Sequence, residues 1–270
     1  INLEIDIPRA NIADLKEYYP IQIGKEGLNW LDTSLLKGEA KNTKITVKGN
    51  PKDFPYVNHK NEPDSKKGIF KITSEIINST VEYGSGWPYA ENFDINLTIN
   101  GSRIEFLANK GHILNNTIKS FKGLIEDFTE TQPMLLIETT TDSPLDIMLN
   151  AVNKSPIKQA MKGTSDDMRG KGPGELNLHL NIPMKNVDNI TFNGIYTFTG
   201  SSLDNPSLDL PLLSNINGTL IFDTNTVSIT NAEAILFDQP VAITLNNLKD
   251  ITLIDIKGSV DTDFIKSKLG

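Results

Sequence analysis

The chain has 270 residues, a formal net charge of −8 and no Cys. The acidic balance gives no field that would attract nucleic acid or an anionic bilayer, and the lack of Cys removes disulfides, thiolate metal sites and cysteine nucleophiles. The hydrophobic share of 38% lies below the usual apolar content of globular domains, which favours sheets with one apolar face.

The N-terminal part begins with a strand pattern and continues with two helix patterns. Leu3, Ile5 and Ile7 alternate with polar residues, as in a strand with one apolar face. Residues 10–19 and 25–36 show apolar spacings of three and four, which predict two short helices.

A β-hairpin is predicted over residues 93–108. Apolar residues alternate with polar ones from Phe93 to Ile99 and again from Ile104 to Ala108, and Gly101-Ser102 supplies the turn. Every second side chain of a strand lies on the same face, so this hairpin is expected to have one apolar face.

The C-terminal part repeats these patterns. A further strand runs from Leu176 to Ile182, and strand-turn-strand patterns cover residues 216–229 and 241–245. Residues 143–154, with Pro144 in the first turn and one apolar stripe, form the best helix, and another is expected near 261–269. No apolar run approaches the roughly 20 residues of a membrane helix.

These elements predict a mainly β protein, with a curled antiparallel sheet and a few short helices. Helices this few cannot cover a large sheet, so the apolar face must pack on another sheet or line an elongated groove filled by a ligand. The pattern of a strand followed directly by a helix recurs along the chain. In addition, residues 87–106 align without a gap on residues 210–229, with Asn92 aligned on Asn215. We therefore expect two β-groove units, 1–142 and 143–270, cut from a longer protein.

Motifs for chemistry are absent from the sequence. His59, His112 and His179 are scattered without a metal-ligand spacing, and no nucleophile elbow is present. The pair Asp166-Asp167 lies in a glycine-rich stretch that leads into a strand rather than a helix, so we interpret it as a mobile connector. The sequence thus predicts no enzyme activity, no metal and no cofactor.

The two tryptophans are expected to have packing roles. Trp87 precedes Pro88 at the entry to a strand, where a large ring can seal the edge of an apolar surface. Trp30 is expected to anchor the helix over residues 25–36 to the sheet.

A series of landmarks resembles the middle of YhdP-type AsmA-like proteins. The likeness covers nearly the whole chain and is carried by Trp30-Leu31, Phe54-Pro55, Trp87-Pro88, Asp142-Ser-Pro and the run from Gly172 to Pro183. The resemblance implies a segment of a long protein that is anchored in the bacterial inner membrane, crosses the periplasm and carries phospholipid in an open β-groove (β-taco). It implies no catalytic residues, and contact with membranes through other parts of the parent protein.

The partner expected from the resemblance is a phospholipid or another acyl-chain ligand. Aliphatic and Phe side chains on the inner face of the strands are expected to line the groove. This predicted lining consists of Phe93, Ile95, Leu97, Ile99, Ile104, Phe106, Leu176, Leu178, Leu180, Phe198, Leu220, Phe222, Val227 and Ile229. From the residues alone, the alternative is a structural or adhesive β-sandwich in which the same side chains form a dry core.

Overall fold

The computed structural model describes residues 1–12, 14, 33–82, 87–155, 158, 165–185, 189–208, 210–248 and 251–259. Helix α2 (Leu145–Asn153) is the α-helix whose two ends both lie within these ranges. The elements η2 (Pro51–Asp53) and η4 (Pro206–Leu208) are single 3-10 turns. The strands are β1 (Asn2–Asn11), β2 (Leu35–Gly49), β3 (Gly68–Val81), β4 (Ala90–Asn100), β5 (Arg103–Ile113), β6 (Asn116–Ile125), β7 (Met134–Asp142), β8 (Arg169–Lys171), β9 (Gly174–Pro183), β10 (Thr191–Asn205), β11 (Leu210–Asp223), β12 (Val227–Leu236), β13 (Gln239–Leu248) and β14 (Ile251–Gly258).

All fourteen strands belong to one sheet. Strands β1 to β7, β9 and β10 to β14 are neighbours in chain order, and the short β8 pairs with β10. Among the described strands the path starts at β1 and ends at β14, so the sheet does not close on itself. The predicted mainly β, antiparallel fold is confirmed, and the described strands form one sheet rather than the two separate sheets of the β-sandwich alternative.

The chain divides into two compact units. The first unit contains residues 1–141 and 178–192, and the second contains 142–177 and 193–270. The expected division into two β-groove units at residue 142 stays a prediction, and each unit is described by itself below.

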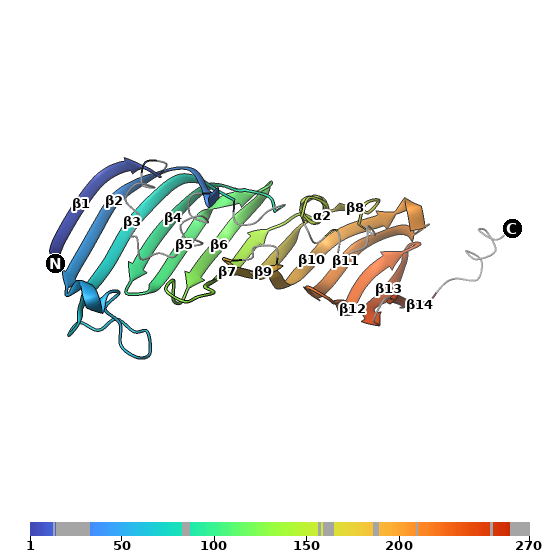
Figure 1. Cartoon of the computed structure of the whole chain (residues 1–270). Helices are drawn as coiled ribbons and strands as arrows, with labels where there is room; N and C mark the ends of the chain where they lie inside the picture. The colour runs from blue at the N-terminus through green and yellow to red at the C-terminus, as the bar shows by residue number, and fades with distance from the viewer. Residues whose placement is uncertain are drawn as a thin grey trace. The chain divides into compact units, whose positions relative to one another are not determined.

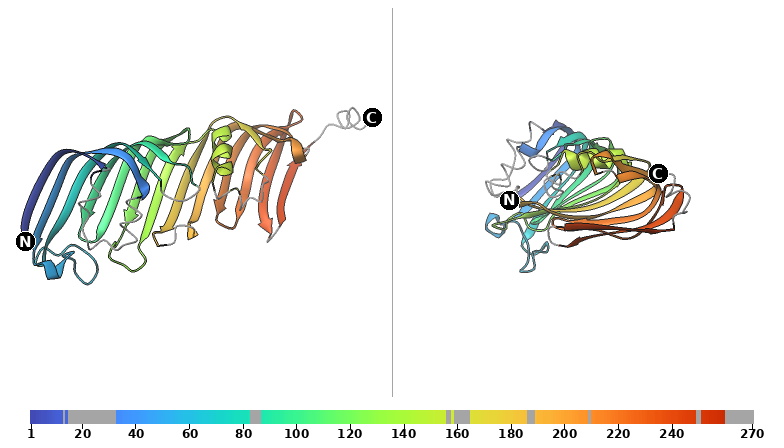
Figure 2. Two further views of the ribbon diagram at one scale, coloured as in Figure 1. Left: turned by 45° about the horizontal axis from the view of Figure 1, so that its top comes forward. Right: turned by 90° about the vertical axis from the view of Figure 1, so that its right-hand side faces the viewer.

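In the first unit, strands β1 to β6 follow one another as antiparallel neighbours (Figure 1). Their ribbons curve along their length, most clearly in β1, β2 and β3 (Figure 2). The predicted hairpin is confirmed, because β4 and β5 pair with Leu97 opposite Phe106 and turn at Gly101, whose φ of 61° suits glycine.

In the second unit, helix α2 confirms the helix predicted over residues 143–154. Part of the expected mobile connector is instead ordered, because Arg169–Lys171 forms β8 and pairs with β10. A Cβ atom at Gly170 would lie 2.4 Å from the Leu145 Cγ atom, so this glycine lets strand and helix approach closely.

The helices predicted near the N-terminus need correction at one end each, although Thr33 and Ser34 in the second range are helical. Ala10 and Asn11 continue β1, and Leu35 and Leu36 begin β2, so these ends of the ranges 10–19 and 25–36 are strand. Apolar spacings of three are found in helices but also where a bulge interrupts a strand. Trp30, most of both ranges and the helix expected near 261–269 lie outside the described residues.

Candidate functional site

The inner face of the first unit carries an unbroken row of isoleucines across six strands. Residues directly opposite each other in an antiparallel pair lie on the same face of the sheet. The successive cross-strand partners in this row are Ile5, Ile45, Ile72, Ile99, Ile104 and Ile125. This isoleucine row forms an apolar surface that runs across the strands rather than along them.

A second inner row contains a polar break beside the predicted lining residue Leu97. Leu97 lies between Ser74 and Phe106, and Phe106 lies opposite Gly123. The Ser74 hydroxyl is 2.7 Å from the hydroxyl of Thr43, and both side chains are buried. The two hydroxyls bond to each other, so they add little polarity to the apolar face.

The outer face of the same strands is polar. In the pairs facing outward, Thr98 is opposite Glu105 and Lys71 is opposite Asn100. Scattered apolar residues such as Leu107, at 44% exposure, interrupt this face singly. The first unit therefore has one apolar and one solvated face, as the alternation predicted.

The second unit has the same two-faced construction. Tyr196 is opposite Leu220, and Phe222 pairs with Gly194 on one side and Val227 on the other. Further apolar rows link the last three strands, namely Ile229 with Leu245 and Ile254, and Ala232 with Ile243 and Ile256.

The predicted lining residues all lie in strands, but they differ in exposure. Half of them are buried within the protein, namely Phe93, Ile95, Ile104, Leu176, Leu180, Phe198 and Phe222. The other half are partly exposed, namely Leu97, Ile99, Phe106, Leu178, Leu220, Val227 and Ile229. A ligand on the inner face would reach the second group first, so Leu97 and Phe106, which face each other, mark the accessible part of the first unit.

An aromatic cluster covers one end of the first unit's inner face. The segment 50–67 lies at the ends of β2 and β3 (Figure 1). Its Phe54 ring lies 4.9 Å from the ring of Phe70 on β3, which in turn makes an edge contact with Phe128 at 6.4 Å. Tyr56 in the same segment is only 1% exposed. This end of the face is closed by protein.

In the second unit, the stretch that leads into helix α2 covers the inner face at Tyr196. The Tyr196 hydroxyl donates a hydrogen bond of 2.8 Å to the Ser143 carbonyl, just before the helix begins. The Tyr196 ring packs against Phe198 with centroids 4.9 Å apart. Burial, helped by the charge of Asp146, raises the pKa of the Tyr196 phenol, so the hydroxyl stays a donor.

Several inner-face residues were not included in the predicted lining. Ile45, Ile72 and Phe121 share the face of Ile99 and Phe106 through the register. Alternation within residues 44–47 and 69–72 signals the first two, but the sequence does not say which strands are neighbours. Phe121 follows two outward residues, Lys119 and Ser120, which break the alternation on β6.

The tryptophan and the histidine considered for ligand or metal binding lie in ordinary packing or surface environments. Trp87 is buried and makes a T-shaped contact with Phe192, with ring centroids 6.2 Å apart. His179 is half-exposed on the outer face, 3.9 Å from Glu138. In the described part of the chain, no three His, Asp or Glu side chains gather closely enough to hold a metal ion. Of the helices described, none has the length and apolar character needed to cross a bilayer.

Comparison with known proteins gives one family and one curated relative. The family model described as "YhdP protein" matches residues 1–269. The relative is the "Intermembrane phospholipid transporter YhdP" of Escherichia coli (strain K12), which is 22% identical over 254 residues, or 94% of this chain. The chain spans 19% of that protein's length. No solved structure matches the chain.

Proposed function

This chain belongs to the YhdP family, and we propose that it is one segment of a phospholipid-carrying bridge, whose inner apolar face holds acyl chains between the inner and outer membranes. The proposal extends to this chain what the name of its relative says of that protein, an intermembrane phospholipid transporter. It places the segment in the periplasm, as part of an envelope protein anchored in the inner membrane, and assigns it no catalytic step.

The observation that carries the proposal is the continuity of the apolar face in the first unit. The isoleucine row crosses six neighbouring strands, and Leu97 and Phe106 beside it are partly exposed. A soluble sheet with an apolar face of this extent needs a covering partner. Acyl chains are apolar and long, and they suit a face with few polar groups.

The energetics also favour an acyl chain on this face. Burial of each CH₂ group contributes about 0.8 kcal/mol, so a chain of some sixteen carbons gains on the order of 10 kcal/mol in a lined groove. The charged headgroup is expected to stay in water at the open side of the sheet, because burial of an unpaired charge is strongly unfavourable.

Site-specific photo-crosslinking tests the proposal. A photoreactive amino acid is placed at Leu97 or Leu178 on the inner face, and at Asn96 or His179 on the outer face of the same strands, in the full-length protein in bacteria. We expect phospholipid adducts, identified by mass spectrometry, at the two inner positions only.

The controls separate transport from mere surface binding. Equal adducts at inner and outer positions would indicate nonspecific contact with lipid. No adduct at either inner position, in protein that crosslinks normally to a neighbouring peptide, would contradict the proposal.

A further inference from the structure

β-Bulges recur on neighbouring strands of the first unit, and the registers stagger them along the strands. The bulges of β2 and β3 lie on opposite sides of the Ala40–Ile76 pair, and those of β3 and β4 lie on opposite sides of the Ser79–Phe93 pair. The pairing registers shift between Lys41 and Lys44, between Ile76 and Ser79, and between Glu91 and Asp94. At each of these places two successive outward residues separate two inner ones. The inner residues are therefore three positions apart in the sequence instead of two. The two-residue bulge positions, which we call the crease, are 8–9 on β1, 41–42 on β2, 77–78 on β3, 91–92 on β4, 109–110 on β5 and 119–120 on β6.

Three asparagines in the crease adopt left-handed backbone conformations. Asn42, Asn78 and Asn92 lie on neighbouring strands with φ of 49°, 52° and 54°. Asn and Gly tolerate this region, whereas β-branched residues do not. A bulge inserts an extra residue, bends its strand and increases its twist. Staggered bulges on β2, β3, β4 and β5 therefore bend the sheet along an oblique line.

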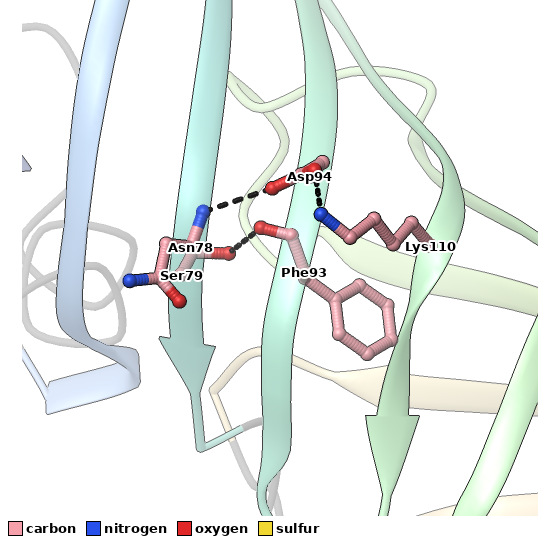
Figure 3. Close-up of polar contacts among 5 residues, drawn as sticks. All are labelled: Asn78, Ser79, Phe93, Asp94 and Lys110. Carbon is pink, nitrogen blue, oxygen red and sulfur yellow. Dashed lines mark hydrogen bonds and ion pairs between the residues drawn. The ribbon is translucent and has the colours of Figure 1, made fainter.

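Side chains fix the crease by replacing backbone hydrogen bonds that the bulges interrupt (Figure 3). The Asn78 backbone N–H donates to Asp94 Oδ1 at 3.0 Å, and the Lys110 Nζ atom lies 2.9 Å from Asp94 Oδ2. The Ser79 hydroxyl donates to the Phe93 carbonyl at 3.0 Å. One carboxylate thus joins bulged segments of β3, β4 and β5.

The concave side of the crease combines small residues with large ones such as Phe93. A bend brings inner side chains together, so the small residues make room for the large ones. The inner positions next to the bulges include Ala10, Ala40, Ser79, Ala90, Ala108 and Gly111. At Gly111, a Cβ atom would lie 2.3 Å from the Phe93 ring, so the glycine makes room for a side chain at the bend.

The same device recurs in the second unit. Gly200 on β10 and Asn215 on β11 have φ of 64° and 49°, and registers shift at both places. The Gly200 backbone N–H donates to Asn217 Oδ1 at 3.0 Å. Asn217 follows the left-handed Asn215 by two positions, as Asp94 follows Asn92. The ungapped alignment of residues 87–106 on 210–229 superimposes these positions, so the recurrence does not depend on apolar alternation.

We propose that the crease holds each unit bent enough for its apolar face to enclose acyl chains, and that Asn42, Asn78 and Asn92 act as positioning residues for lipid in the first unit. The bend itself is independent of any ligand, while the lipid part of this inference rests on the proposed function. No crease asparagine is assigned direct contact with lipid.

The test compares substitutions that exclude or allow the left-handed conformation. Asn78→Val and Asn92→Val, singly and together, remove the residues that tolerate it, whereas Asn78→Gly and Asn92→Gly keep it accessible. Asn96→Val is the matched control, because Asn96 lies on β4, is exposed and has no left-handed backbone. Nitroxide labels at Lys71 and Thr80, on either side of the β3 bulge, report the bend as a distance distribution.

We expect the Val variants to shift the distance by several ångströms and to lower the copurified phospholipid per protein several-fold. The Gly variants and Asn96→Val should match the wild type in both measurements. An unchanged distance in the Val variants would overturn the crease, and a changed distance with full lipid load would overturn its role in holding lipid.

The failures of the two proposals can be told apart. If wild-type protein carries no phospholipid, the proposed function fails, and the distance measurement alone decides whether the crease sets the bend. If the double Val variant does not fold, the single variants supply the comparison.

Discussion

The two units cover their inner faces in different ways. In the first unit, Phe93 is buried against other residues of the sheet, with the Phe121 ring 5.3 Å away and Gly111 beneath it. In the second unit, Tyr196 is buried partly by the chain that leads into helix α2. The difference shows that a one-faced sheet can bury apolar residues either by bending or by adding a helix at one place. Bending leaves neighbours such as Leu97 partly exposed.

The largest expected effect comes from Phe93→Ala, which removes the side chain at the bend of the first unit. Phe93 is 1% exposed, and loss of a buried Phe side chain leaves a cavity that costs about 3–5 kcal/mol. Urea denaturation should show this decrease in the free energy of unfolding. Leu97→Ala on the same strand should cost clearly less, because Leu97 is partly exposed. Equal decreases in the free energy of unfolding in the two variants would mean that the buried residue at the bend stabilises the fold no more than the partly exposed one.

The helix-covered region can be disturbed from β8. In Gly170→Val the new side chain would collide with Leu145 and Leu149 of α2, and overpacking of this kind typically costs about 1–3 kcal/mol. Lys171→Val is the control, because Lys171 is exposed on the same short strand. Thermal unfolding of both variants measures the difference. A Gly170→Val protein as stable as the control would indicate that the helix is free to move away.

The hydrogen bond below the helix has a smaller expected effect. Tyr196→Phe keeps the ring against Phe198 but removes the donor to the Ser143 carbonyl. A typical hydrogen bond contributes about 1 kcal/mol, and we expect a loss of that size in urea denaturation. Hydrogen exchange should quicken in α2 and stay unchanged in β4 and β5. Quickened exchange in both regions would contradict a local role.

The smallest expected effect is the pH dependence at the crease. The backbone N–H of Asn78, and then Lys110, lower the pKa of the Asp94 carboxyl. A carboxyl with a lowered folded-state pKa stabilises the fold above its unfolded pKa, and that contribution is lost as the pH falls through the folded pKa. Asp94→Asn should therefore be less stable than wild type near neutral pH, by under about 1 kcal/mol for this partly exposed group, and the gap should close in acid. A stability difference between Asp94→Asn and wild type that does not depend on pH would indicate that the substitution acts through the shape of the side chain rather than through its charge.

The sequence predicted the fold wherever alternation was regular. The strand from Leu176 to Ile182, the hairpin over 93–108 and helix α2 follow directly from period-two and helical patterns. The errors lie where alternation breaks. Ile7 and Ala10 are both inner residues three apart, because Pro8 and Arg9 lie between them at the crease. The spacing of three between Ile12 and Leu15 suggested a helix over residues 10–19, whereas β1 continues to Asn11.

The lining was less predictable than the fold. Alternation assigns a face to each side chain, but exposure depends on which neighbours curve over it. Phe93 and Leu97 share a strand and a face, yet the first is fully buried and the second is accessible. The isoleucine row was also hidden, because its members come from six strands and only the registers bring them together.

The isoleucine row has a consequence for how a ligand would move on this surface. Neighbouring strands are about 4.8 Å apart, so the same side chain recurs at that interval across the first unit. An acyl chain displaced by one strand would meet nearly identical surroundings, and β-branched side chains have few alternative rotamers with which to trap it. Successive positions would then have almost equal free energy, and travel in either direction would be diffusive. Net flow would have to be imposed at the ends of the path.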